Sequence, residues 1–469
     1  MAILKNFLRA DIVRGNSTTK VTLIGAGPAG SLLAIYLAQR GFHVEIFERR
    51  PDMRKTPISA GRSINLAIST RGIHALRAAG VLDSIMKIAV PMKGRMMHAV
   101  TGELTFQRYG KDDTEVIYAV LRSELSMALM NEAEKHPNVK IHFNERCLGM
   151  DFKTGEIELQ DNDIVGHPQK ILTEVVIGTD GSASAIRMDM LKSGRFNFAQ
   201  QFLEHGYKEL TIPAGKNGEY QIEKNALHIW PRKTYMLIAL PNIDGSFAGI
   251  FFFPFEGEPS FASLDTEEKV LQFFKTQFPD VVPLMPNLLE NYFSNPTGAM
   301  VTIKCAPWHI AGKALLLGDA AHAIVPFFGQ GVNCAFESCA YLAECIDRHG
   351  NDWPKVFAEY ESLRKVNTDA IAELALENFV EMRDHVADPK FLFKKKVEQA
   401  LQQKYPTIFV PKYSMVTFQR LPYAVALARG KIQDRILAEL CGSIDRVEDL
   451  PWQRADLLIK KELNDLQIQ

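Results

Sequence analysis

The chain has 469 residues, which is enough for two or three domains with a full-sized hydrophobic core. Hydrophobic residues make up 46% and charged residues 23%, an ordinary globular composition that argues against a collagen-like, coiled-coil or mostly disordered chain. The 54 basic and 55 acidic residues give a formal net charge of −1. The chain therefore has no global positive charge of the kind that binds nucleic acid or an anionic membrane.

Cysteine and histidine patterns exclude two further classes. Six cysteines are too few and too unevenly spaced for a disulfide framework, and neither a C-x-x-C pair nor an H-E-x-x-H motif supports a metal site. No stretch reaches the roughly 18 uncharged apolar residues that a membrane-spanning helix needs. We therefore expect a cytoplasmic enzyme with no metal and no evident membrane anchor.

The first clear secondary structure follows a mixed leader, residues 1–20. Residues 21–24 form a short apolar run that predicts a buried strand, 29–40 predict a helix, and 43–48 predict a second strand after Gly41. A strand, a helix and a strand in this order predict a βαβ unit with parallel strands.

Later segments predict more strands and then helices. Residues 206–254 alternate short strands with turns, which predicts a separate sheet, and residues beyond about 352 show mainly helical patterning. Further strands are predicted at 139–143, 156–159, 174–178, 226–230, 235–240 and 314–317, with a helix from about Asn333. The fold class is therefore α/β, with a Rossmann-like domain interleaved with a mixed or antiparallel sheet and followed by a C-terminal helical segment.

A glycine motif lies between the first strand and the first helix. Gly25, Gly27 and Gly30 fit G-x-G-x-x-G, in which the glycines allow a tight turn, close approach of a pyrophosphate and close helix–strand packing. Glu48 ends the second strand and can accept hydrogen bonds from an adenosine ribose. The pattern predicts a dinucleotide site, which by itself could hold NAD(P) or FAD.

Two further elements follow predicted strands. Gly318 and Asp319 place a carboxylate at a strand end, shortly before the glycine-rich segment 329–333 that opens another helix. Asp180, Ser184 and Arg187 form an Asp-Gly-x-x-Ser-x-x-Arg element with helical spacing. Taken singly, each element is usually structural.

Together, in this order, the three elements resemble the fingerprint of the class A flavoprotein aromatic hydroxylases, which have the para-hydroxybenzoate hydroxylase fold. The resemblance favours FAD, and NADPH becomes a transiently docking co-substrate because there is no second G-x-G-x-x-G. Arg122 matches a flavin-contacting arginine of the family, although a lone arginine is usually a helix-surface residue. The implied cofactor-binding residues are Gly25, Gly27, Ala29, Gly30, Phe47, Glu48, Arg49, Arg50, Ala67, Arg122, Leu148, Asp180, Asp319, Gly331, Val332 and Asn333.

Longer strings narrow this resemblance to the kynurenine 3-monooxygenases. These strings are 61–67, 205–210, 227–231, 318–333 and 413–418. By motif match, Arg95 pairs with the substrate carboxylate through its planar fork, and two phenylalanines wall the ring pocket. Some relatives have a histidine at the position of Phe328. The implied substrate-binding residues are Arg95, Tyr109, Phe327, Phe328, Asn378 and Tyr413.

The resemblance implies NADPH- and O2-dependent hydroxylation of L-kynurenine to 3-hydroxy-L-kynurenine through a flavin C4a-hydroperoxide, in tryptophan degradation and NAD biosynthesis. The flavin carries the chemistry, so no catalytic side chain is assigned. Eukaryotic relatives have a C-terminal membrane anchor, whereas residues 452–463 here predict an amphipathic helix, which favours a soluble bacterial-type enzyme. A monomer or a homodimer is expected.

The expected domain division follows the same resemblance. Residues 21–80, 115–195 and 305–350 form the FAD-binding domain, 81–114 and 196–304 the substrate domain, and 351–469 the helical region. Two alternatives stay open: a class A hydroxylase acting on another aromatic acid, and a non-catalytic binder on the same fold that resembles the GDP dissociation inhibitors.

Overall fold

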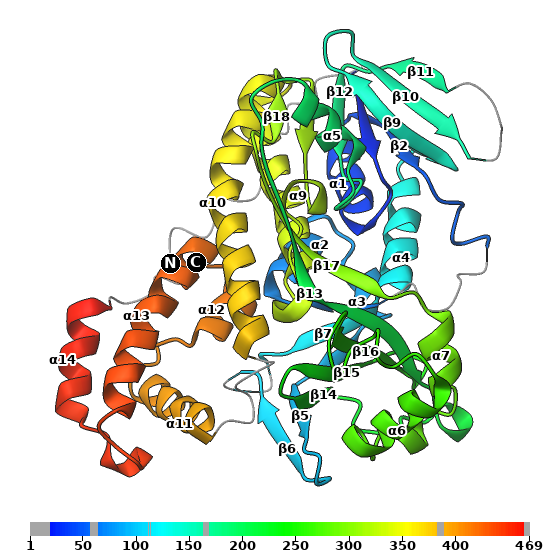
Figure 1. Ribbon diagram of the computed structural model, residues 1–469. Helices are drawn as coiled ribbons and strands as arrows, with labels where there is room; N and C mark the ends of the chain where they lie inside the picture. Colours follow the sequence, from blue (N-terminus) through cyan, green and yellow to red (C-terminus); the bar gives the residue numbers. More distant parts are fainter. Residues whose placement is uncertain are drawn as a thin grey trace.

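The computed structural model describes residues 19–56, 64–110, 112, 114–162, 168–381 and 389–463. Residues 1–18 of the expected leader and residues 61–63 of the first family string lie outside the described residues. Figure 1 shows two halves, each built around a larger sheet, with the C-terminal helices beside them.

The first half is a six-stranded sheet in the order β18-β19-β12-β1-β2-β8. Neighbouring strands are parallel from β19 to β8, and only β18 runs antiparallel, at one edge. The central strands consist almost entirely of buried residues, as expected where helices cover both faces of a parallel sheet. Its strands are β1 (Lys20–Ile24), β2 (His43–Glu48), β8 (Val139–Phe143), β12 (Val175–Gly178), β18 (His309–Ile310) and β19 (Ala314–Leu316).

Helices pack against this sheet and against one another. Helix α1 packs against α4 and α9, and α2 packs against α9. Helix α1 is apolar on all sides because it lies in the core, with buried residues from Gly30 to Ala38. These helices are α1 (Pro28–Ala38), α2 (Thr70–Ala78), α3 (Leu82–Met86), α4 (Arg122–Glu134), α5 (Ala185–Lys192), α8 (Asp319–His322) and α9 (Gly331–His349). The predicted βαβ beginning is confirmed as β1, α1 and β2.

The second half is a seven-stranded sheet in the order β17-β13-β16-β15-β14-β5-β6. All its pairs are antiparallel except β14 with β5. The separate sheet was predicted, but the prediction of only short strands was wrong for β13, which has 16 residues and pairs with both β16 and β17. The strands are β5 (Gly94–His98), β6 (Leu104–Arg108), β13 (Asn197–Ile212), β14 (Ala226–Arg232), β15 (Tyr235–Pro241), β16 (Phe247–Pro254) and β17 (Gly298–Ala306).

The two faces of this sheet have different neighbours. Helices α6 (Glu267–Gln277) and α7 (Leu288–Ser294) lie on one face, over an aromatic core that includes Trp230, Phe251 and Phe274. The other face packs toward the first half and toward the C-terminal helices. We call the first half, which contains the six-stranded sheet, the flavin-type half because its motifs resemble those of flavoproteins.

Two small antiparallel sheets complete the β structure. One has the order β3-β7-β4, with β3 (Asn65–Ile68), β4 (Val90–Met92) and β7 (Ile117–Leu121). The other has the order β11-β10-β9, with β9 (Glu145–Asp151), β10 (Glu156–Asp161) and β11 (Gln169–Leu172). The sequence domain boundaries are not tested by these sheets and stay a prediction.

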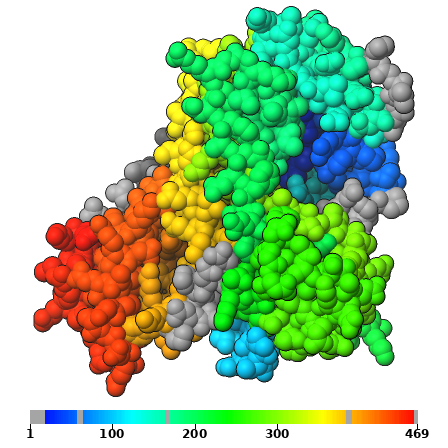
Figure 2. Space-filling view, viewed as in Figure 1, coloured from blue at the N-terminus to red at the C-terminus, as the bar shows by residue number. Residues whose placement is uncertain are grey.

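The chain after residue 352 is helical, as predicted. Helix α10 begins after Asp352, whose carboxylate accepts a hydrogen bond from the Lys355 amide, and Pro354 fits its first turn. Figure 2 shows the last helices projecting from the body of the molecule beside α10. The helices of this region are α10 (Trp353–Val380), α11 (Pro389–Lys404), α12 (Lys412–Thr417), α13 (Tyr423–Cys441) and α14 (Trp452–Glu462). No helix in the described part of the chain is long and apolar enough to cross a membrane.

Candidate active site

A cavity of about 350 Å³ lies between the two halves of the molecule. One part is lined by loops at the carboxyl edge of the six-stranded sheet, the place where open α/β sheets bind ligands. The other part is lined by the inner face of the seven-stranded sheet and by α12. We call these parts the nucleotide end and the substrate end.

The nucleotide end begins at the predicted glycine motif, and each glycine has a physical reason. Gly25 adopts φ +101°, a left-handed conformation, and a Cβ on Gly30 would lie 2.1 Å from the Gly25 carbonyl oxygen. A Cβ on Gly27 would meet nothing within 4 Å, and Gly27 lines the cavity at the N-terminus of α1. Gly25 and Gly30 therefore serve the fold, whereas Gly27 leaves room for a ligand at a helix N-terminus, where negative charge is favoured.

Glu48 lies beside this motif, with contacts that the sequence did not predict. Its Oε2 accepts a hydrogen bond from the Ala26 amide at 2.9 Å, and its Oε1 accepts one from the Arg50 amide at 3.0 Å. The Arg50 side chain, which is 49% exposed, also donates to Glu48. Burial works against the charge of Glu48, but Arg50 outweighs it, so the pKa of Glu48 is lowered. The carboxylate stays ionised, and a ribose hydroxyl that bonds to it would share it with Arg50 or displace the Arg50 side chain.

Asp319 brings a second carboxylate to the cavity. It is the first residue of α8, directly after β19, and its side chain is open to the cavity although the residue lies deep in the protein. Burial raises the pKa of Asp319, and the positive charge of Arg122 acts in the opposite direction. Arg122, the first residue of α4, lines the same cavity and is not a plain surface arginine. Ala29, Ala67, Gly331 and Val332 also line it.

The Asp180 element holds two loops together. The Asp180 carboxylate accepts a hydrogen bond from the Ala185 amide at 2.7 Å, and Ser184 caps α5 by accepting one from the Arg187 amide. The buried Arg187 guanidinium donates to the Ala320 carbonyl at 2.7 Å, which ties this element to α8 and Asp319. Within the described ranges one Asp180 oxygen has no hydrogen-bond partner, and burial raises the pKa of this carboxyl group.

Other predicted cofactor residues lie outside the cavity wall. The Phe47 carbonyl accepts a hydrogen bond from the Gly25 amide, and the Phe47 ring stacks on His142. Phe47 therefore supports the glycine turn. Asn333 is fully buried, and its side-chain amide donates hydrogen bonds to the Ala67 and Gly329 carbonyls. Arg49, directly after β2, and Leu148, on β9, are exposed on the surface.

The substrate end contains a half-buried cation among aromatic rings. The Arg95 guanidinium lies over the ring of Tyr109 at 5.4 Å and over that of Tyr413 at 4.9 Å. The two rings stack with their centroids 5.5 Å apart, and Tyr413 stacks in turn on Phe328. Among the described residues Arg95 has no ion pair, and Arg95 Nε and the Tyr109 hydroxyl are buried without hydrogen-bond partners. A half-buried cation without an ion pair, together with buried donors that lack partners, indicates an anionic ligand.

Apolar side chains form the rest of this end. Phe327 stacks on Phe379 and contacts Phe252, and both Phe327 and Phe328 face the cavity. Asn378 is different, because its amide donates to the Phe327 carbonyl at 2.7 Å and the residue does not line the cavity. The structure thus brings five of the six predicted substrate residues together and places Asn378 behind the phenylalanine loop.

Gln330 and Thr417 are among the cavity residues that sequence reasoning missed. Gln330 lies between two glycines of the 318–333 string and lines the cavity. Thr417, in the 413–418 string, also lines it, and its buried hydroxyl makes no hydrogen bond to any residue in the described part of the chain. Both lie inside quoted strings, so their position was the available signal, but neither residue type alone indicates a ligand.

The nucleotide end fits FAD. The helix N-terminus is open at Gly27, two carboxylates lie at strand ends, and Asp319 faces the cavity without a protein partner among the described residues. No cluster of potential metal ligands occurs among these residues. A dinucleotide with a polar ring system fits this donor set better than a metal ion does.

Comparisons with known proteins agree with this geometry. Residues 18–203 match the family model described as FAD binding domain, which confirms the predicted cofactor. Solved structures of 2-methyl-3-hydroxypyridine-5-carboxylic acid oxygenase (TM-score 0.64, 21% identity, 80% of this chain and 96% of that one) share the fold. So does a probable FAD-dependent monooxygenase from Pseudomonas aeruginosa (0.61, 17%, 78% and 97%). The predicted fold is thereby confirmed.

Close relatives cover nearly the whole chain. The kynurenine 3-monooxygenase of Myxococcus xanthus (strain DK1622) is 53% identical over 94% of this chain and 95% of the relative, and that of Dictyostelium discoideum is 47% identical over 95% and 98%. The kynurenine 3-monooxygenase of Legionella pneumophila (strain Corby) is 44% identical over 94% and 97%. On this full-length similarity, the chain belongs to the kynurenine 3-monooxygenase family.

Proposed function

We propose that this protein hydroxylates L-kynurenine to 3-hydroxy-L-kynurenine, with FAD as its cofactor and NADPH and O2 as co-substrates. The observation that carries the proposal is the half-buried Arg95 guanidinium, which has no ion pair among the described residues and lines the same cavity as Asp319. Kynurenine has a carboxylate for the cation and an aromatic ring for the apolar walls. The family membership supports the same substrate.

The substrate end would bind kynurenine by its two chemically different parts. The Arg95 fork pairs with the α-carboxylate, and the Tyr109 hydroxyl, buried beside it, donates a further hydrogen bond. Burial raises the pKa of Tyr109 above its ordinary value, so the phenol stays neutral and acts as a donor. These contacts fix the substrate by its amino-acid portion and leave the aniline ring directed into the cavity.

The walls orient the ring and exclude water. Phe327, Phe328 and Phe252 present apolar surfaces beside the loop 329–331, where the cavity turns toward the nucleotide end. When bound and reduced by NADPH, FAD would activate O2 for transfer of one oxygen atom to the ring. The aryl amine already activates the ring, so the protein contributes position and a dry environment, and no side chain needs to act as a base.

Asp319, Arg122 and the glycine motif would hold the cofactor. Asp319 can accept hydrogen bonds from hydroxyl groups of FAD, and Arg122 provides positive charge at the same cavity. The N-terminus of α1 at Gly27 suits the pyrophosphate, and Glu48 suits the ribose.

The test is a turnover assay with the flavin-loaded protein in air. We expect L-kynurenine to accelerate NADPH oxidation and to be converted to a product heavier by one oxygen atom. Anthranilate and salicylate serve as matched aromatic acids that lack the amino-acid chain. If one of these gains oxygen and kynurenine does not, the substrate assignment is wrong while the flavoprotein assignment stands. A protein that stays colourless after FAD addition would contradict both.

A further inference from the structure

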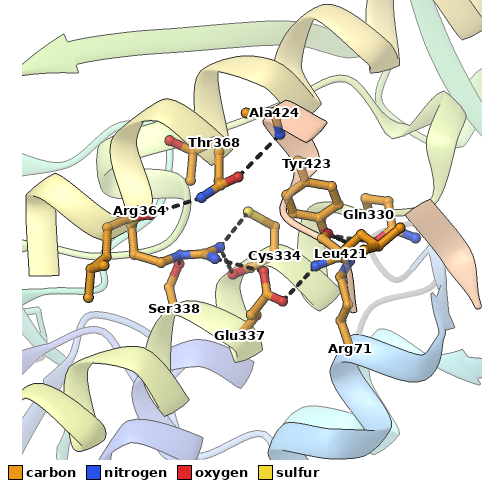
Figure 3. A network of polar contacts seen from close by, with 12 residues as sticks. Arg71, Gln330, Cys334, Glu337, Ser338, Arg364, Thr368, Leu421, Tyr423 and Ala424 are labelled. Carbon is orange, nitrogen blue, oxygen red and sulfur yellow. Dashed lines mark hydrogen bonds and ion pairs between the residues drawn. The ribbon is translucent and has the colours of Figure 1, made fainter. Parts of the chain in front are cut away.

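A buried triad of charges lies between the flavin-type half and the C-terminal helices, as Figure 3 shows. Glu337 on α9 accepts a hydrogen bond from Arg71 on α2 and another from Arg364 on α10, each at 2.7 Å. All three side chains are at most 5% exposed. Two arginines against one carboxylate leave one positive charge in excess. A buried ion pair costs about as much in desolvation as it returns, so stability alone does not account for this arrangement.

Arg71 uses its remaining donors on the C-terminal region. Its Nε donates to the Val416 carbonyl at 3.1 Å and its Nη2 to the Leu421 carbonyl. Val416 is in the last turn of α12, where helix carbonyls have no partner within the helix, so the guanidinium caps this helix. The guanidinium also lies 3.9 Å from the ring centroid of Tyr423. One residue of the flavin-type half therefore fixes the helix that carries Tyr413 and Thr417.

Tyr423 extends this network to the opposite wall of the cavity. Its hydroxyl donates to Gln330 Oε1 at 2.9 Å, and Gln330 Nε2 donates to the Ser69 hydroxyl at 3.3 Å. Tyr423 is fully buried and Gln330 is 1% exposed. Gln330 lies in the loop 329–331, which lines the cavity and in which Gly329 adopts φ +65°. A single hydrogen bond thus ties the start of α13 to the loop beside the proposed flavin position.

We propose that Arg71 and Tyr423 are positioning residues that fasten α12 to the cavity-lining loop around Gln330. They touch neither the cavity nor the proposed ligands. They act through the backbone of α12 and through the Gln330 amide, so that the residues facing the substrate and the loop facing the flavin keep one relative position. The inference rests on the proposed function only for its turnover readout.

The mildest test removes one hydroxyl group. In Tyr423→Phe the ring and its contact with Arg71 remain, but Gln330 loses its donor. We expect the ratio of hydroxylated product to NADPH consumed to fall about three- to tenfold, the range of one buried hydrogen bond. We also expect a changed flavin fluorescence yield in the loaded protein without substrate. In a Gln330→Met background, Tyr423→Phe should then have no further effect on either readout.

The matched control is Tyr360→Phe. Tyr360 is also fully buried, and its hydroxyl has no hydrogen-bond partner among the described residues. This variant should keep the product ratio and the fluorescence of the parent protein. If Tyr423→Phe keeps the product ratio and fluorescence of the parent protein, as Tyr360→Phe should, or if both variants change these readouts to the same extent, the positioning role of Tyr423 is refuted.

A second pair of variants tests Arg71. Arg71→Met and Arg364→Met each remove one arginine and leave Glu337 paired with the other, so neither creates an unpaired carboxylate. Only Arg71→Met breaks the contact with α12. We expect it to raise the KM for kynurenine at least fivefold more than Arg364→Met does, with little change in kcat. Equal effects would make the triad a merely structural feature.

The design separates this inference from the proposed function. If the parent protein binds FAD but does not hydroxylate kynurenine, the substrate assignment fails, and the fluorescence comparison of Tyr423→Phe with Tyr360→Phe still decides the positioning role. If the parent hydroxylates kynurenine and these variants are indistinguishable, only the positioning role fails.

Discussion

The two ends of the cavity are built in different ways. The nucleotide end uses backbone atoms and small residues, and its glycine motif and Glu48 come from one continuous βαβ unit. The substrate end uses side chains that meet only in the folded molecule, because Tyr109 stacks on Tyr413 about 300 residues further along the chain. A site made of backbone allows almost no change, whereas a site made of side chains can lose one contact at a time. Substitutions in the glycine motif should therefore have the largest effects, whereas substitutions of single side chains, at Asp319 and at the substrate end, should have graded effects.

The largest effect is expected for Gly30→Ala. The added methyl group would lie 2.1 Å from the Gly25 carbonyl oxygen, so the turn must distort, at a cost of about 3 kcal/mol or more in folding free energy. The purified protein should lack flavin and have a lowered Tm.

Gly27→Ala is the matched substitution, because its methyl group meets no protein atom within 4 Å. The Tm of the flavin-free protein should stay the same, while FAD affinity falls about tenfold or more through blocked approach of the pyrophosphate. Full flavin content in Gly27→Ala would show that the pyrophosphate lies elsewhere.

At the substrate end, Arg95→Ala should raise the KM for kynurenine by a factor equivalent to about 2–5 kcal/mol, the effect of leaving the substrate carboxylate unpaired. Flavin content should not change. A lowered Tm with an unchanged KM would place Arg95 in the structural core instead. Arg95→Lys, which keeps the charge but not the fork, should lie between the two.

Asp319→Asn should weaken FAD binding by about 1.5–3 kcal/mol, because charge-assisted hydrogen bonds are lost. The pKa of Asp319 is raised by burial, so the ionised carboxylate destabilises the flavin-free fold at neutral pH. The flavin-free variant should therefore have the higher Tm at neutral pH. This advantage should vanish as the pH falls to the ordinary range of an aspartate, near 4, where the parent carboxyl group is protonated as well. Tm measured against pH for both flavin-free proteins checks the sign, and a variant that is less stable at neutral pH would contradict it.

The smallest effect is expected for Tyr109→Phe. Loss of the hydroxyl should raise the KM for kynurenine about three- to tenfold, because one hydrogen bond is removed while the stack on Tyr413 persists. Tyr292→Phe is a control, since the Tyr292 hydroxyl is also buried and has no hydrogen-bond partner among the residues that the structure describes, but belongs to α7, on the other face of the sheet. Equal KM values for both variants would remove the Tyr109 hydroxyl from substrate binding and weaken the idea of a graded end.

The same contrast explains what could be predicted from the sequence. The turn at Gly25 to Gly30 is specified by local backbone geometry, so the motif alone predicted the strand, the helix and the place of a ligand. Asp319 was also found because it follows a short apolar strand. Arg95, Tyr109 and Tyr413 could be assigned only through family resemblance, since no local pattern states that a hairpin residue and a C-terminal helix residue share a cavity.

Other features depend on tertiary contacts that leave no mark in the sequence. Asn378 looks the same in the sequence whether its amide faces a ligand or, as here, the Phe327 carbonyl. Glu48 was expected to accept hydrogen bonds from a ribose, but its carboxylate already accepts hydrogen bonds from the Ala26 amide and the Arg50 side chain. The length of β13 also escaped prediction, because half of that strand is exposed and pairs with β17 without an apolar alternation.

The Arg71 network also has a consequence for the order in which the chain can fold. Arg71 leaves the ribosome 345 residues before Val416. At about 5–20 residues per second, this separation corresponds to roughly 20–70 s of synthesis. The βαβ unit can form during that interval. The Arg71 guanidinium then lacks the helix end that it caps and, for most of the interval, also lacks its ion-pair partner Glu337. The hydrophobic core of the flavin-type half, which extends no further than Tyr360, can form before the last helices are made, whereas Arg71 gains its partners on α12 only with them, so the substrate end of the cavity is completed last.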